Sequence, residues 1–150
     1  MKKYISISII VIIIIAFGLL IFGGNTQIGS ESMSKIIIPN GFNIYKTTND
    51  TLIISNKSSN YTITEIGNKT IKSVFDEYNL KHENHTVSMS STTVGDTKLF
   101  GLNLKINETF IHTNYFYEKN GITYQIYPDG DYDFDTIKQL VSSTNKKFII

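Results

Sequence analysis

The chain has 150 residues, a formal net charge of +1 at pH 7 and no cysteine. The absence of cysteine excludes disulfide bonds, thiolate metal ligands, a cysteine nucleophile and a lipidated cysteine anchor. All 14 basic residues are lysine. A near-neutral chain without arginine lacks the positive field and the bidentate side chains on which nucleic-acid binding depends, so we expect no nucleic-acid partner.

An apolar segment without charged residues covers residues 5–22. As a helix rising 1.5 Å per residue it would be roughly 27 Å long, close to the hydrocarbon thickness of a bilayer. Lys2 and Lys3 precede the segment, and the next basic residue is Lys35. The positive-inside rule therefore predicts a single-pass anchor over residues 1–24, held in membrane lipid through residues 5–22, with the N-terminus cytoplasmic and the domain outside.

Two alternatives compete with an uncleaved anchor. A cleaved signal peptide has an apolar region of about 7 to 15 residues followed by small residues at the cleavage site. The segment here is longer, and Gly23 and Gly24 follow the bulky Ile21 and Phe22, which favours the anchor. A buried core helix is disfavoured because the segment is apolar on every face. The anchor and the signal peptide both place the folded part of the chain outside the cell membrane.

The remainder divides into a linker and one domain. Residues 25–34 are rich in Gly, Ser, Asn and Thr, which predicts a flexible linker, so the domain is expected over residues 35–150. Alternating and β-branched runs predict four initial strands, at residues 35–38, 42–46, 51–55 and 61–66. Helical spacing follows over residues 70–82, with one apolar stripe made of Ile71, Val74, Phe75 and Tyr78.

The second half of the domain repeats this order of strands followed by a helix. Four further strands are predicted at residues 86–94, 100–106, 109–118 and 122–127. Gly95-Asp96 and Asn120-Gly121 are predicted as hairpin turns, the second being the preferred dipeptide of a type I′ turn. After a turn at residues 128–130, a helix is expected from Asp133 or Asp135 to residues 143–146, with an apolar stripe made of Phe134, Ile137, Leu140 and Val141.

Hairpin-length connections and two amphipathic helices predict an α+β fold: a mainly antiparallel sheet with two packed helices. The run from Ile36 to Phe42 (I-I-I-P-N-G-F) and the run from Ile137 to Ser143 (I-K-Q-L-V-S-S) resemble the first strands and the closing helix of PsbP-like domains. The resemblance covers residues 35–147. It implies an α/β/α sandwich and a role in binding or assembly at a membrane surface, and it carries no ligand residue over to this chain.

Acidic residues alternate at the start of the second helix. Asp129, Asp131 and Asp133 are candidate cation ligands, but an EF-hand loop starting at Asp129 would need Gly and Glu where Phe134 and Leu140 stand. The favoured interpretation is a turn that leads into an acid-capped helix. The weaker alternative is a cation site.

Three histidines complete the candidate chemistry. His82 and His85 flank Glu83 near the end of the first helix, and we interpret them as solvated helix-end residues in preference to metal ligands. His112 is isolated in a strand and is interpreted as a sheet residue in preference to a general base. Because no nucleophile elbow, P-loop or dinucleotide motif occurs, we expect no enzymatic activity and no cofactor.

Glycosylation sequons are in mild excess over chance, and several fall at predicted turns. Chance in a chain rich in Asn and Thr is the open alternative. They are Asn49, Asn56, Asn60, Asn68, Asn84 and Asn107. The leading hypothesis is a membrane-anchored, non-enzymatic module that binds a protein or envelope component outside the membrane. Two alternatives stay open: a cation- or small-ligand-binding protein, and an envelope hydrolase without a recognisable motif.

Overall fold

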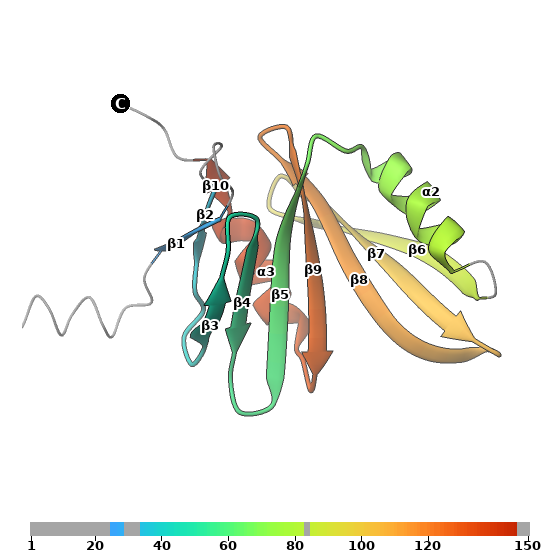
Figure 1. Ribbon diagram of the computed structural model, residues 1–150, viewed down its shortest axis with the longest axis horizontal. Helices are drawn as coiled ribbons and strands as arrows, with labels where there is room; N and C mark the ends of the chain where they lie inside the picture. Colours follow the sequence, from blue (N-terminus) through green and yellow to red (C-terminus); the bar gives the residue numbers. More distant parts are fainter. Residues whose placement is uncertain (1–24, 29–33, 83–84, 147–150) are drawn as a thin grey trace, which may run out of the picture.

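A computed structural model describes residues 25–28, 34–82 and 85–146, and its main feature is a seven-stranded antiparallel sheet (Figure 1). The strand order is β3-β4-β5-β9-β8-β7-β6. The strands are β3 (Asn43–Thr47), β4 (Thr51–Ser55), β5 (Ser59–Gly67), β6 (Thr86–Val94), β7 (Thr97–Ile106), β8 (Thr109–Lys119) and β9 (Ile122–Gly130). The predicted α+β fold with an antiparallel sheet is thus confirmed.

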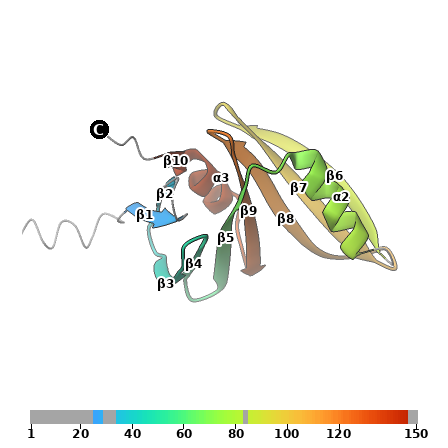
Figure 2. The same cartoon turned by 45° about the horizontal axis from the view of Figure 1, so that its top comes forward.

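Two helices pack on opposite faces of this sheet, α2 (Ile71–Lys81) and α3 (Phe134–Ser143). Phe116 and Tyr117 are neighbours on β8, so their side chains point to opposite faces. Phe116 belongs to a small buried cluster with Val74 of α2, whereas Tyr117 belongs to the large buried cluster that contains Ile137 of α3. Figures 1 and 2 show α2 beside β7 and β8, and α3 behind β5 and β9.

The large cluster is the core of the domain. Ile137, Leu140 and Val141 of α3 are fully buried in it, together with side chains from β4, β5 and β9. Fully burying one such aliphatic side chain stabilises the fold by about 1.5–3 kcal/mol. Phe134, which was predicted in the same helical stripe, is 38 % exposed and packs instead against the ring of Tyr115. The stripe therefore begins one turn later than the sequence indicated.

A second, three-stranded sheet covers one end of the core, in the order β1-β2-β10. It consists of β1 (Asn25–Ile28), β2 (Ser34–Ile37) and β10 (Asn145–Lys146). Residues 25–28 therefore form a strand, although they lie inside the segment that was predicted to be a linker. Strand β1 forms because its backbone pairs with β2 from Asn25 against Ile37 to Ile28 against Ser34, and because the Ile28 side chain is buried.

Both helices begin at a side-chain cap, and the two predicted hairpin turns are present. Thr70 caps α2 by accepting a hydrogen bond from the backbone N–H of Ser73, and Asp133 caps α3 in the same way through Thr136. Asn120 and Gly121 both have positive φ, as a type I′ turn requires. At the β6–β7 turn only Gly95 has positive φ, which is the pattern of a type II′ turn.

Pro128 lies inside β9, although residues 128–130 were predicted to be a turn. It pairs with Tyr61 of β5 on one side. On the other side, the pairing of β9 with β8 ends at Ile126, opposite Tyr115. Beyond that point β9 has a neighbour on one side only, and an edge position of this kind tolerates a residue without a backbone N–H.

The predicted anchor over residues 1–24 and the last residues of the predicted domain, 147–150, lie outside the described residues. Within residues 25–28, 34–82 and 85–146, neither helix has the length and apolar character needed to cross a bilayer.

Candidate functional site

A cleft opens between α2 and the face of the sheet on which that helix packs; we call it the α2 cleft. It has a volume of about 370 Å³, which falls within the size range of small-molecule sites. Its walls come from β5, α2, β8, β9 and the segment before α2. The lining residues are Ile66, Lys69, Val74, Glu77, Tyr78, Lys81, His82, His112, Asn114, Phe116 and Gln125.

Four polar side chains form a hydrogen-bonded row in this cleft. Gln125 Nε2 donates to Asn114 Oδ1 at 3.0 Å, and Asn114 Nδ2 donates to the Tyr78 hydroxyl at 2.7 Å. The Tyr78 hydroxyl and His112 Nε2 are 2.8 Å apart. Because the tyrosine oxygen already accepts from Asn114, we assign its proton to the bond with His112, which places the imidazole proton on Nδ1.

The row is assembled by strand alternation and helical spacing. His112, Asn114 and Phe116 are alternate residues of β8, so their side chains point to the same face of the sheet. Tyr78 and Val74 are four residues apart on α2 and therefore lie on one side of the helix. Asn114 is only 3 % exposed, so its amide depends on Tyr78 and Gln125 for hydrogen bonds.

Burial keeps the two titratable members of the row neutral near pH 7. The pKa of His112 is lowered, first because burial disfavours the imidazolium form and second because of the charge of His82. Burial also raises the pKa of the Tyr78 hydroxyl, and the hydrogen bond from Asn114 opposes that rise only in part. The cleft therefore presents neutral donors and acceptors.

Charged side chains lie at the rim of the cleft. Lys69 Nζ pairs with a carboxylate oxygen of Glu77 at 2.8 Å, and both side chains are about half exposed. The ring of His82 stacks on that of Tyr78 with centroids 4.5 Å apart, and His82 Nδ1 hydrogen-bonds the backbone carbonyl of Tyr78. The rim therefore carries an ion pair with no net charge and, beside it, two stacked aromatic rings.

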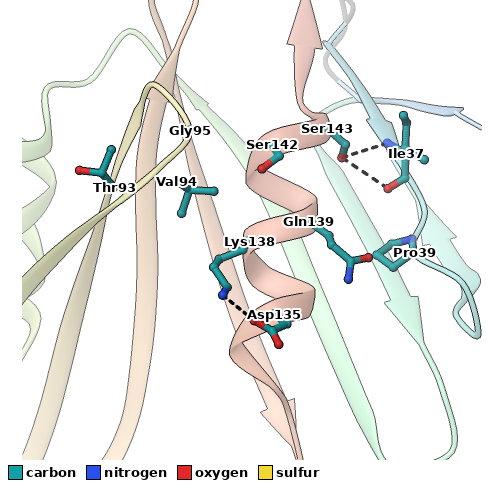
Figure 3. A pocket seen from close by; sticks show the side chains of 10 residues that line it. All are labelled: Ile37, Pro39, Thr93, Val94, Gly95, Asp135, Lys138, Gln139, Ser142 and Ser143. Atoms are coloured by element: carbon teal, nitrogen blue, oxygen red, sulfur yellow. Dashed lines mark hydrogen bonds and ion pairs between the residues drawn. The ribbon is translucent and has the colours of Figure 1, made fainter.

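A wider groove lies beside α3, between β2 and the β6–β7 turn (Figure 3). Its polar groups are largely bonded to one another: Lys138 Nζ pairs with Asp135 at 2.5 Å, and the backbone N–H of Ile37 donates to Ser143 Oγ. These contacts are solvent-exposed, whereas the hydrogen bonds that join Tyr78, His112, Asn114 and Gln125 in the α2 cleft are partly buried, so we take the α2 cleft as the candidate site.

The acidic residues predicted as cation ligands lie in different elements of the structure. Asp129 lies in β9 opposite Asn60, and Asp131 is exposed in the connection to α3. Both carboxylate oxygens of Asp133 accept hydrogen bonds from Thr136, which lowers the pKa of Asp133. In the described part of the chain, no three His, Asp or Glu side chains are grouped closely enough to hold a metal ion.

The histidines at the end of α2 lie near one another. The rings of His82 and His85 have centroids 5.9 Å apart. His85 Nδ1 is buried and has no hydrogen-bond partner among the described residues, whose range excludes Glu83. His112, interpreted from the sequence as a sheet residue, lies in β8, bonds to Tyr78 and borders the same cleft as His82.

Sequon asparagines lie on the surface wherever the structure describes them. Asn84 falls outside the described residues. The exposed sequon residues are Asn49, Asn56, Asn60, Asn68 and Asn107. Asn56 Oδ1 accepts hydrogen bonds from the backbone N–H groups of Ser58 and Ser59, so its carboxamide is engaged in a local turn.

Neither a family model, nor a curated protein, nor a solved structure matches this chain. Its site is therefore interpreted from its own geometry.

Sequence reasoning did not single out Tyr78, Asn114 or Gln125 as functional. Tyr78 was assigned to the packing stripe of its helix. One signal was present in the sequence: His112 and Asn114 occupy alternate positions of a strand next to Phe116, where apolar residues are usual. Polar residues on a buried strand face need partners, and such positions mark candidate sites.

Proposed function

We propose that this chain is a membrane-tethered, non-enzymatic binding module of the PsbP-like type, working outside the cell membrane, and that the α2 cleft is its recognition site. The ligand class is a small neutral polar group, either a free molecule or a moiety of a protein or envelope component. The observation that carries the proposal is the hydrogen-bonded row from Gln125 through Asn114 and Tyr78 to His112.

The row supports recognition because its geometry is set before a ligand arrives. Asn114 is held from both sides, so little side-chain freedom is lost when a ligand binds. Val74 and Phe116 are buried at the base of the cleft and supply apolar contact beside the polar groups. An apolar surface with a few fixed donors and acceptors is the usual composition of a small-molecule site.

A hydrolase is the second candidate, because His112, the Tyr78 hydroxyl and the Glu77 carboxylate border one cavity. Binding is favoured over catalysis on three grounds. The raised pKa of Tyr78 disfavours its phenolate, Glu77 is paired with Lys69, and His112 Nε2 is engaged by Tyr78. We expect no saturable hydrolysis of p-nitrophenyl acetate by the full chain. Turnover that disappears in His112→Asn would overturn the non-enzymatic assignment.

The cation-binding alternative is disfavoured by the cap at α3. Asp133 uses both carboxylate oxygens to hold Thr136, so a bound cation would compete with the cap. We expect millimolar calcium to leave the melting temperature of the full chain unchanged. An upward shift that is lost in Asp131→Asn would restore the cation site.

The tether is supported by the uncharged residues 5–22 and by the two lysines before them. Fractionation of cells and N-terminal sequencing of the mature chain test it. We expect the chain in the membrane fraction with an N-terminus ahead of residue 5. A soluble mature chain starting near residue 25 would show that the segment is a cleaved signal.

Ligand recognition is tested by NMR on the full chain in detergent micelles, with N-acetylglucosamine as a probe that carries hydroxyl groups and one amide. We expect concentration-dependent shifts of the His112 ring and of the Asn114 and Gln125 side-chain amides. Losing one hydrogen bond to the ligand costs about 1.4 kcal/mol, so Tyr78→Phe is expected to weaken binding about tenfold.

Tyr45→Phe is the matched control, because Tyr45 is 76 % exposed and lies outside the α2 cleft. It removes the same hydroxyl from the same residue type and should leave the shifts unchanged. Equal loss in both variants, or shifts confined to residues away from α2 and β8, would contradict the assignment of the cleft.

A further inference from the structure

Strand β6 forms one edge of the seven-stranded sheet and lacks the charges, the proline and the bulge that often protect an edge. It runs for nine residues, Thr86–Val94, with no charged residue and no proline. Its register against β7 is continuous from Thr86 opposite Lys105 to Val94 opposite Thr97. All its side chains except Val87 and Val94 are exposed. Such an edge offers its unpaired backbone groups to another strand.

The opposite edge, β3, is protected in several ways. It has only five residues, it carries Lys46, and its register against β4 shifts between Ile44 and Lys46. Short length, charge and a bulge are the devices by which edge strands avoid pairing with other chains. The contrast between the two edges singles out β6.

The backbone groups available on β6 follow from the turn that joins it to β7. A two-residue turn makes Val94 and Thr97 a hydrogen-bonded pair, and such pairs alternate along an antiparallel ladder. The N–H and C=O groups of Ser88, Ser90 and Thr92 therefore face β7. Those of the odd-numbered residues face outward; they are Val87, Met89, Ser91 and Thr93.

We propose that β6 pairs with β6 of a second copy of this chain, antiparallel and centred on Ser90. In this register Val87 lies opposite Thr93 of the second copy and Met89 lies opposite its Ser91, so every outward N–H and C=O group gains a partner. Ser90 lies opposite Ser90 at the twofold axis, as a non-hydrogen-bonded pair. The two seven-stranded sheets become continuous across the interface.

The chemistry of the strand favours a second copy over an unrelated peptide. A twofold axis places each residue against its own sequence, so a charged strand would face like charges, whereas β6 has none. The register sets β-branched Val and Thr against each other and Ser88 against Thr92, which are favourable cross-strand pairs. Confinement in one membrane, as in the proposed function, would raise the effective concentration, but the pairing does not depend on it.

The test uses single cysteine substitutions, which are clean probes because the chain has no cysteine. Residues in a non-hydrogen-bonded antiparallel pair have Cα atoms about 4.5 Å apart, within disulfide range. Full-length Ser90→Cys in membranes should therefore form a disulfide-linked dimer with a mild oxidant. A mixture of Ser88→Cys and Thr92→Cys chains should also cross-link, because these positions face each other.

The matched controls are the same two variants alone and Lys46→Cys on the other edge. Four residues along the strand separate Ser88 from its own copy, roughly 13 Å, so neither Ser88→Cys nor Thr92→Cys should self-link. Ser91→Pro removes an outward N–H without touching the ladder to β7, and should abolish the Ser90→Cys dimer while thermal melting stays unchanged.

A monomeric Ser90→Cys chain that retains the wild-type melting curve would overturn the proposal. So would equal cross-linking of all variants, which indicates random collision, or a disulfide from Ser90→Cys to a different protein, which indicates another occupant. If Ser90→Cys fails to fold, the Ser88→Cys and Thr92→Cys mixture decides: a dimer supports the register and a monomer overturns it.

Discussion

Tyr78 is the residue on which the α2 cleft depends. Its hydroxyl accepts from Asn114 and donates to His112, so it links a strand residue that is almost fully buried to one that is only partly buried. Its ring also supports the stacked ring of His82. A single side chain from α2 thus connects the helix to β8 by polar contacts as well as by packing.

Replacing Tyr78 by Phe is expected to lower the free energy of unfolding by about 1–3 kcal/mol, because the Asn114 amide is then buried with one donor unsatisfied. Urea unfolding measures the change. Tyr45→Phe, on an exposed side chain, should cost about 0.5 kcal/mol or less. Equal stability of Tyr78→Phe and the parent chain would mean that water replaces the hydroxyl.

His112 is expected to make stability depend on pH. Its pKa in the folded state lies below the ordinary 6.5, so the unfolded chain binds more protons between the two values. The stabilisation is therefore complete above about pH 6.5 and is lost as pH falls through the lowered pKa. Thermal melting from pH 7.5 to 5 should show the decline, with a smaller slope in His112→Asn. Identical slopes in both chains would assign the decline to other groups.

The parts of the site could not have been joined from the sequence. Tyr78 and His112 are 34 residues apart, and their contact depends on how α2 crosses β8, which no local pattern specifies. The sequence shows that His112 and Asn114 occupy alternate strand positions. It does not show that Tyr78 is their hydrogen-bond partner, because the packing of a helix on a sheet depends on the whole apolar surface and not on one pair of residues.

At the scale of elements, the sequence predicts a turn or a helix start correctly where a single dipeptide or capping residue determines the local backbone conformation. Asn120-Gly121 gave the central hairpin because both positions require positive φ. The bounds of β4 and β6 agree with the prediction at both ends. The misses at β1 and at Pro128 have different causes. Pro128 stays in its strand because it pairs with Tyr61, which lies far away in the sequence, whereas β1 is a polar segment that pairs with the neighbouring β2 and buries Ile28.

The cap of α3 is the element-scale feature most open to test. Asp133→Ala should lower the free energy of unfolding by about 1 kcal/mol, because the N–H of Thr136 loses its acceptor. Asp131→Ala is the matched control, an exposed aspartate two residues earlier that should change stability by about 0.5 kcal/mol or less. Chemical denaturation of both variants gives the comparison. A larger loss in Asp131→Ala would instead point to a role for the acidic turn itself.

At the scale of the whole molecule, the small sheet adds residues 25–28 to the described fold. A chain starting at residue 25 should melt like the full-length protein, whereas one starting at residue 35 loses β1 and the buried Ile28. The loss should be about 2 kcal/mol or more, because Ile28 alone accounts for a fully buried aliphatic side chain. Calorimetry of the two truncated chains decides the matter.

Point variants distinguish the contribution of the Ile28 side chain to stability from that of the β1 backbone. Ile28→Ala should cost about 2–5 kcal/mol, whereas Ile37→Ala, on the neighbouring strand but 48 % exposed, should cost about 0.5 kcal/mol or less. If Ile28→Ala matches Ile37→Ala, the folded unit does not depend on β1 and the linker interpretation regains support.

The two buried clusters differ greatly in size, and this asymmetry has a kinetic consequence. Among the described residues, α3 shares a cluster of sixteen buried hydrophobic side chains, whereas the cluster beneath α2 has three: Val74, Leu102 and Phe116. Opening α2 alone therefore requires much less free energy than dismantling the whole domain. Amide protons of α2 should therefore exchange with deuterium faster than those of α3.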